Sequence, residues 1–255
     1  MTPFKIKWLY EKLPPGMSSI QIARLKKLYF EDAGKQWNYV VKGWPMQSDG
    51  SGLAIQLPDG KGPLQELEIT VTFEVFRGSA ASAVARVLQA DLRRTTVTAS
   101  QPFPFPYKAK IRVDLNDLQE LLNDRERFFD TVVHEIGHVL GIGMSWNSAP
   151  GQSLIRNDAT GAFYVGLYAC TAYAKVKELS GRPDIPLDKE YLGSTPAYHW
   201  SEQQLPQEIM SPVLDDPTIA VNAMGGSNVI SDVSVGALLD LGYEVNPTAA
   251  QPLPE

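Results

Sequence analysis

The segment VVHEIGHVLG, residues 132–141, constrains the fold more than any other part of the chain. His134 and His138 are four positions apart, so on an α-helix both imidazoles lie on one face, one turn from each other. Two imidazoles in this arrangement can share a tetrahedral metal ion, and Glu135 can reach a metal-bound water without becoming a ligand. The segment therefore predicts a helix that carries part of a metal site.

The helix around this segment is predicted to run from about Asp124 to Leu140. Apolar residues spaced by three and four positions form its buried face, and Gly141 is placed to end it. The apolar residues are Phe129, Val132, Val133, Ile136 and Leu140.

A catalytic zinc ion needs three protein ligands and keeps a fourth position open for water. The chain has three histidines in total, and the remaining one, His199, lies in the segment YHWSEQQLPQEIMSP. This makes His199 the strongest candidate for the third ligand. Two alternatives stay open: Glu178 or Glu190 closes the site, or His199 is a solvated loop residue. Met144 stands six positions after His138, but its thioether is a poor zinc ligand.

The first half of the chain alternates between strand and helix patterns. Residues 4–10, 67–76 and 110–115 alternate apolar side chains with others, which predicts strands, and residues 81–92 fit either type. Ser18 and Gln21 have the spacing of a capping box at the start of a helix. The apolar stripe of that helix is Ile22, Leu25, Tyr29, Ala33 and Trp37.

The second half of the chain is rich in Gly, Pro, Ser and Asn as far as residue 230, with one convincing helix around residues 165–179. A last helix is predicted to begin after Ser231 as its N-cap and to end at Gly242. We therefore expect an α/β N-terminal subdomain, residues 1–141, and a loop-rich C-terminal subdomain, residues 142–255.

Composition excludes several other classes of protein. The 255 residues are 44% hydrophobic and 20% charged, which is ordinary for a soluble globular protein. No apolar run approaches the ~20 residues of a membrane helix, and the net charge of −6 argues against a nucleic-acid partner.

The single Cys170 cannot form an internal disulfide and is expected to be a small buried apolar residue. The N-terminus lacks the apolar region of a signal peptide, so the chain as written is expected in the cytosol, or outside the cell if a leader was removed.

The order of these segments resembles the leishmanolysin branch of the metzincin zinc peptidases, especially its bacterial members. In HEIGHVLGIG and the later HW, 60 residues separate His138 from His199, and EIMSP follows. Inside the insertion, GLYACTAYAKVKELSG and IPLD keep the order of the family segments, and ISDVSVGALLDLGYEVNPTAA is similar to the closing helix and tail. The resemblance covers most of the chain from about Ile20 and is weakest before residue 66.

The resemblance implies a zinc metalloendopeptidase, a hydrolase in which Glu135 is the general base for a zinc-activated water. It implies His134, His138 and His199 as zinc ligands and Met210 as the Met-turn residue beneath the metal. The implied fold has a twisted, mostly parallel sheet, two long helices and an antiparallel edge strand in the region ARVLQADL. Such an edge can bind an extended peptide or protein substrate by strand addition. We expect a monomer.

Two other functions stay open. One is a zinc-binding module that recognises peptides without cleaving them, which would predict loss of Glu135, although Glu135 is present. The other is an HExxH protease with a glutamate as its third ligand, which would leave His199 without a role. The eukaryotic relatives are also disulfide-rich and secreted, and this chain, with one cysteine, lacks those features.

Overall fold

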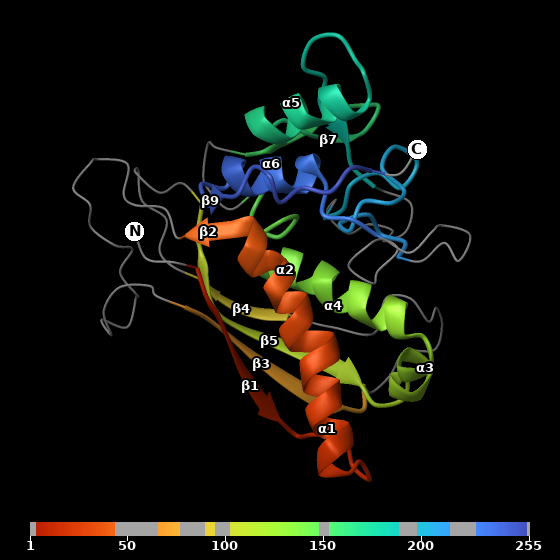
Figure 1. Cartoon of the computed structure of the whole chain (residues 1–255). Helices are drawn as coiled ribbons and strands as arrows, with labels where there is room; N and C mark the ends of the chain where they lie inside the picture. Colours follow the sequence, from red (N-terminus) through yellow and green to blue (C-terminus); the bar gives the residue numbers. More distant parts are fainter. Residues whose placement is uncertain are drawn as a thin grey trace, which may run out of the picture.

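A computed structural model gives the arrangement of most of the chain. It describes residues 4–43, 66–76, 90–94, 103–147, 153–188, 198–214 and 228–253, with the backbone alone at 90–94. Within these residues the protein is mixed α/β, with a small, mostly parallel sheet and several helices (Figure 1). The expected α/β class is confirmed at this level.

The main sheet has four strands in the order β1-β3-β5-β4. The strands are β1 (Ile6–Glu11), β3 (Leu67–Glu74), β5 (Pro106–Asp114) and β4 (Ala90–Arg94). β1, β3 and β5 are parallel, and β4 pairs antiparallel with β5 at the edge. The three predicted strands are confirmed, and so is an antiparallel edge strand near the expected position, whereas residues 81–89 lie outside the described part.

The side-chain alternation of β3 shows why this segment forms an inner strand. Leu67, Ile69 and Val71 are fully buried in the core. Glu68 points to the opposite face, where it pairs with Lys7 of β1 at 3.2 Å. The strand is therefore apolar toward the helices and charged toward solvent, as its period of two requires.

Two long helical segments lie on the same side of this sheet (Figure 1). The first consists of α1 (Ser19–Leu25), η1 (Lys26–Glu31) and α2 (Asp32–Val40), and the second is α4 (Arg125–Leu140), preceded by the short α3 (Leu118–Asn123). The predicted capping box is present, because Ser18 accepts the Gln21 N–H and Gln21 accepts the Ser18 N–H. The predicted α4 ends as expected at Gly141, whose φ is +113°.

The first helical segment contains a π-helical stretch, η1, that we did not predict. Of the predicted apolar stripe, Ile22 is half-buried. Leu25, Tyr29, Ala33 and Trp37 are buried and are spaced by four positions. Residues at this spacing drift around an α-helix of 3.6 residues per turn. The wider π turn offsets this drift, so the stripe stays on the buried face.

The second half of the chain contains more regular structure than its composition indicated. Strands β6 (Ile155–Asn157), β7 (Ala162–Tyr164) and β8 (Ile185–Pro186) form a three-stranded sheet, and helices α5 (Leu167–Val176) and α6 (Asp232–Asp240) pack together. The predicted N-cap Ser231 accepts the Val233 N–H. A Cβ at Gly236 would lie 2.7 Å from the Ala169 backbone, which explains how closely α5 and α6 approach.

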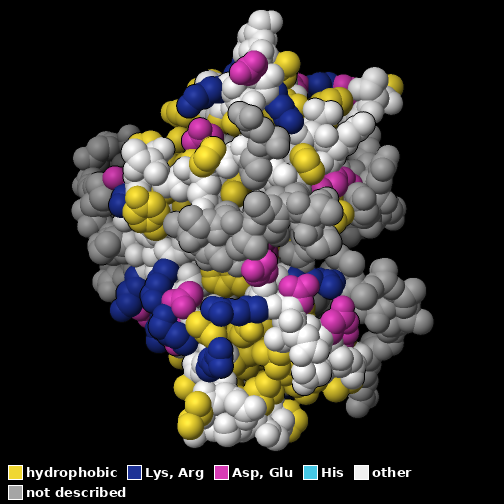
Figure 2. All heavy atoms as spheres, turned by 45° about the vertical axis from the view of Figure 1, so that its right-hand side comes forward, with side chains coloured by type: hydrophobic (Ala, Val, Ile, Leu, Met, Phe, Trp, Pro, Cys, Tyr) yellow, Lys and Arg dark blue, Asp and Glu magenta, His cyan; other side chains and the backbone are white. Residues whose placement is uncertain are grey.

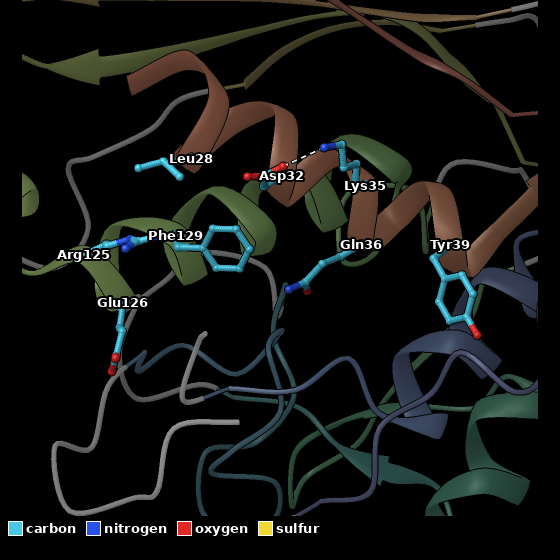
Figure 3. A pocket seen from close by; sticks show the side chains of 8 residues that line it. All are labelled: Leu28, Asp32, Lys35, Gln36, Tyr39, Arg125, Glu126 and Phe129. Carbon is cyan, nitrogen blue, oxygen red and sulfur yellow. Dashed lines mark hydrogen bonds and ion pairs between the residues drawn. The ribbon is translucent and has the colours of Figure 1, made fainter. Parts of the chain in front are cut away.

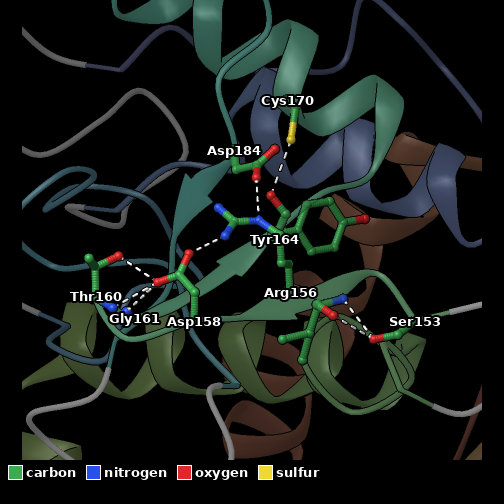
Figure 4. A network of polar contacts seen from close by, with 9 residues as sticks. Ser153, Arg156, Asp158, Thr160, Gly161, Tyr164, Cys170 and Asp184 are labelled. Carbon is green, nitrogen blue, oxygen red and sulfur yellow. Dashed lines mark hydrogen bonds and ion pairs between the residues drawn. The ribbon is translucent and has the colours of Figure 1, made fainter.

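Polar side chains fasten this second region together. At the end of α6, Asp240 accepts the N–H groups of Tyr168 and Ala169, so it caps the start of α5. At the small sheet, Arg156 of β6 forms ion pairs with Asp158 and Asp184 (Figure 4). These contacts tie the residues before and after α5 to each other.

The two halves of the chain also join through backbone pairing. Strand β2 (Val41–Gly43) pairs antiparallel with β9 (Glu244–Val245), so the C-terminal segment returns to the first half. The division into subdomains 1–141 and 142–255 stays a prediction. No helix among the described residues has both the length and the apolar character needed to span a membrane.

Candidate metal site

Helix α4 places His134 and His138 side by side in the interior, with 6% and 8% of their surfaces exposed. The Nδ1 of His134 lies 2.6 Å from the Ile209 carbonyl oxygen, and the Nδ1 of His138 lies 2.9 Å from that of Ile142. A carbonyl oxygen can only accept, so each Nδ1 carries the proton and donates it. Each Nε2 therefore presents a lone pair, which is the form of imidazole that binds a metal ion.

His199 reaches the same point from a distant part of the chain. Its Nε2 lies 3.1 Å from the Nε2 of His134 and 3.0 Å from that of His138. Its Nδ1 is buried and has no hydrogen-bond partner among the described residues. No histidine is visible on the face shown in Figure 2.

The spacing of the three Nε2 atoms can be compared with that of a metal centre. Two nitrogen ligands of a tetrahedral ion at ~2.0–2.1 Å are ~3.3 Å apart. The observed 3.0 and 3.1 Å are close to that value. A single proton on the Nε2 of His199 could satisfy only one of the two facing lone pairs, whereas one cation satisfies all three nitrogens. This buried group could therefore hold a metal ion.

Burial also keeps the three histidines neutral. It lowers the pKa of His134 to about 3, with a further contribution from the neighbouring His138, and lowers the pKa of His138 to about 4. The pKa of His199 is likewise well below its usual value, first because of burial. Since the neutral imidazole is the ligand, metal binding at neutral pH needs no proton to leave.

Glu135 follows His134 in α4 and is half-buried. Loss of solvation raises the pKa of its carboxyl group to about 8 in the metal-free protein. A divalent cation nearby would favour the charged carboxylate and lower that pKa again. Glu135 is not one of the three grouped residues, which agrees with a role beside the metal rather than as a ligand.

Met210 lies against α4 between the two histidine positions. Its side chain is fully buried, and a Cβ at Gly137 would lie 2.3 Å from its Sδ. Gly137 is therefore the residue that lets the thioether approach the helix. Gly137 was not among the predicted site residues, although a glycine inside a helix costs about 1 kcal/mol relative to alanine and so signals a close approach.

The turn after α4 brings the third histidine into place. Gly143 has φ +76°, and a Cβ there would lie 2.2 Å from the carbonyl oxygen of Tyr198, the residue before His199. Only glycine leaves room for this approach. The predicted turn residue was Gly141 alone. Gly143 was not predicted, because its partner is 55 positions away.

The remaining candidates are placed as follows. Glu178 is exposed and does not join the three histidines, and Glu190 lies outside the described residues. Cys170 is buried, as expected. Its thiol donates to the Tyr164 carbonyl oxygen, and burial raises the pKa of the thiol to about 11. Met144 is half-buried, and its exclusion as a ligand stays a prediction.

A cavity of about 500 Å³ lies between the first helical segment and α4 (Figure 3). Its lining includes Asp32 and Tyr39 of α2 and Phe129 of α4, and none of the three histidines contributes to it. It is therefore separate from the histidine group.

The fold and the site define a class of protein: mixed α/β, with a buried three-histidine group that could hold a metal ion. No protein-family model matches the chain, and no curated protein matches it either.

Proposed function

We propose that this protein is a zinc-dependent endopeptidase of the leishmanolysin-like metzincin type, with His134, His138 and His199 as zinc ligands. The observation that carries the proposal is the convergence of the three Nε2 atoms, although His199 follows His138 by 61 positions. A chance pair of helical histidines would give no reason for the third to join them in the interior.

Zinc suits this group of ligands better than other common cations. Three neutral imidazoles are nitrogen donors, whereas magnesium and calcium prefer oxygen. A zinc site with three protein ligands is typical of catalytic centres, because it keeps one coordination position open. When bound, the ion would supply Lewis acidity, polarising a peptide carbonyl and making water a better nucleophile at neutral pH.

Glu135 is the residue that moves the proton. It lies next to His134, and its carboxylate makes no hydrogen bond with the described residues. Its carboxylate is thus available to take a proton from the attacking water and to pass it to the leaving amine. This role needs no direct bond between Glu135 and the metal.

The position of β4 supports a peptide substrate. Among the described strands, β4 has β5 as its one neighbour in the sheet, and α4 contacts β4. An extended peptide could add to the other side of β4 through backbone hydrogen bonds and so run past the histidine helix. The mostly parallel sheet, its antiparallel edge strand and the two long helical segments support the proposal at the level of a mixed α/β fold.

Metal analysis and a digest of a peptide library test the proposal together. We expect one zinc ion per chain, cleavage at internal peptide bonds, loss of cleavage in a chelator and recovery when zinc is added back. Hydrolysis that continues after the metal is shown to be absent would contradict the proposal. Stoichiometric zinc without any cleavage would favour the peptide-binding module instead.

A further inference from the structure

Glu208 is a fully buried carboxylate outside the histidine group. Its Oε2 accepts the Met210 N–H at 2.6 Å, and its Oε1 accepts the N–H and the hydroxyl of Ser231 at 3.1 and 3.0 Å. Ser231 is the N-cap of α6. One carboxylate therefore connects the turn of residues 208–211, called here the Met210 turn, with the start of α6.

The Met210 turn supports two of the three histidines. The Ile209 carbonyl oxygen accepts the Nδ1 hydrogen of His134 at 2.6 Å. The Met210 carbonyl oxygen accepts the N–H of Trp200 at 3.1 Å, and Trp200 directly follows His199. A shift of this turn would therefore change the orientation of one ligand and the backbone position of another.

We propose that Glu208 is a positioning residue for the metal centre, which it serves by fixing the Met210 turn against α6. The inference rests on the three-histidine site of the proposed function and deepens it. Glu208 does not touch the metal and acts through Ile209 and Met210. Mutation of partners that orient metal ligands in this way typically weakens metal binding ~10–100-fold.

The chemistry of Glu208 indicates why a carboxylate is needed here. At least three donors converge on its two oxygens, and a carboxylate can accept at both. A glutamine of the same shape would present an NH₂ group to one side, so at least one N–H would lose its acceptor. Burial raises the pKa of Glu208 to about 7, and its hydrogen bonds with Ser234, Met210 and Ser231 act in the opposite direction.

The test compares Glu208→Gln with Glu202→Gln in the full-length protein. Glu202 lies in the same segment, is half-buried, and accepts the Val213 N–H at 3.1 Å. Both changes remove one carboxylate. Glu202 also hydrogen-bonds the Ser211 side chain at the end of the turn, but only Glu208 joins the Met210 N–H to the start of α6. The measurements are zinc affinity by competition with a chelating dye, the visible spectrum of the Co²⁺-substituted protein, and circular dichroism of the metal-free protein.

We expect Glu208→Gln to fold but to bind zinc ~10–100-fold more weakly, with an altered Co²⁺ spectrum. Glu202→Gln should keep both wild-type properties. Unchanged zinc affinity and an unchanged Co²⁺ spectrum in Glu208→Gln would overturn the inference, and so would equal losses in the two variants.

A second variant decides the matter if Glu208→Gln does not fold. Ser231→Ala keeps the backbone donor to Glu208 and removes the hydroxyl donor, so it should weaken zinc binding by a smaller factor. Wild-type affinity in Ser231→Ala would then overturn the inference.

A wild-type protein that binds zinc but cleaves no peptide would contradict the proposed function alone. One that binds no divalent cation would overturn both.

Discussion

His134 donates its Nδ1 hydrogen to the carbonyl oxygen of Ile209, 75 positions later in the chain, at 2.6 Å. This bond directs the free Nε2 toward His138 and His199 and couples α4 to the Met210 turn. The site is therefore assembled from a helix of the first half and a turn of the second. Predictions about it can be tested by changing either side.

The first prediction concerns the general base. Glu135→Ala should keep stoichiometric zinc, because Glu135 is not a ligand, and should lose peptide hydrolysis by ~10²–10⁴-fold. Zinc content and turnover are measured on the same preparation, with His138→Ala as the variant that should lose the metal. If Glu135→Ala loses zinc as readily as His138→Ala, the assigned roles are wrong.

The second prediction concerns the third ligand. His199→Ala should leave two strong ligands, and its zinc should be lost on dialysis. Met144→Leu should keep zinc and most of its activity, because this exchange roughly conserves volume and a thioether is a poor zinc ligand. The measurement is the zinc content of the two variants after identical dialysis. An empty leucine variant beside a full alanine variant would contradict the ligand assignment.

The third prediction concerns the close approach of Gly143 to Tyr198. A Cβ at position 143 would lie 2.2 Å from the Tyr198 carbonyl oxygen, so Gly143→Ala must displace the backbone next to His199. We expect zinc affinity to fall on the order of tenfold or more. Gly16→Ala is the matched control, because Gly16 has a similar φ of +79° but no atom within 4 Å of its added Cβ.

These two alanine variants share the same backbone strain, on the order of 1 kcal/mol. Thermal unfolding of the metal-free proteins should therefore show that both are destabilised. Zinc affinity should separate them. Equal zinc affinities in the two variants would show that the approach of Tyr198 to Gly143 does not position the ligand.

The fourth prediction concerns pH. Burial raises the pKa of Glu208 from 4.5 to about 7, so between these values the folded state holds a proton that the unfolded state has released. Because the folded state binds more protons, the free energy of unfolding falls as pH rises through this window. The loss of folding free energy caused by Glu208 approaches about 3 kcal/mol above pH 7 and vanishes below pH 4.5.

Glu208→Gln cannot titrate and isolates this effect. Denaturant unfolding of the metal-free wild type and variant at several pH values should show the wild type losing stability relative to the variant between pH 4.5 and 7. A stability difference that is constant with pH, or one of opposite slope, would show that Glu208 is ionised in the folded protein throughout.

Local patterns in the sequence were enough to predict the elements that carry the site. The 3.6-residue periodicity before Gly141 predicted α4 and placed His134 and His138 on one face, and the capping residues Ser18 and Ser231 marked two helix starts. These features depend on neighbours within a few positions, where spacing and side-chain type control the geometry. The histidine count made His199 the candidate for the third ligand, because no other histidine remained.

Only the tertiary structure showed how His199 reaches α4. The contacts that bring it there join residues 55 to 75 positions apart: Gly143 to Tyr198, Gly137 to Met210, and His134 to Ile209. The pairing of β2 with β9 and the hydrogen bond from Ser231 to Glu208 also join residues far apart in the chain. Periodicity contains no information about such distant partners, since close packing and the satisfaction of buried polar groups are properties of the assembled core.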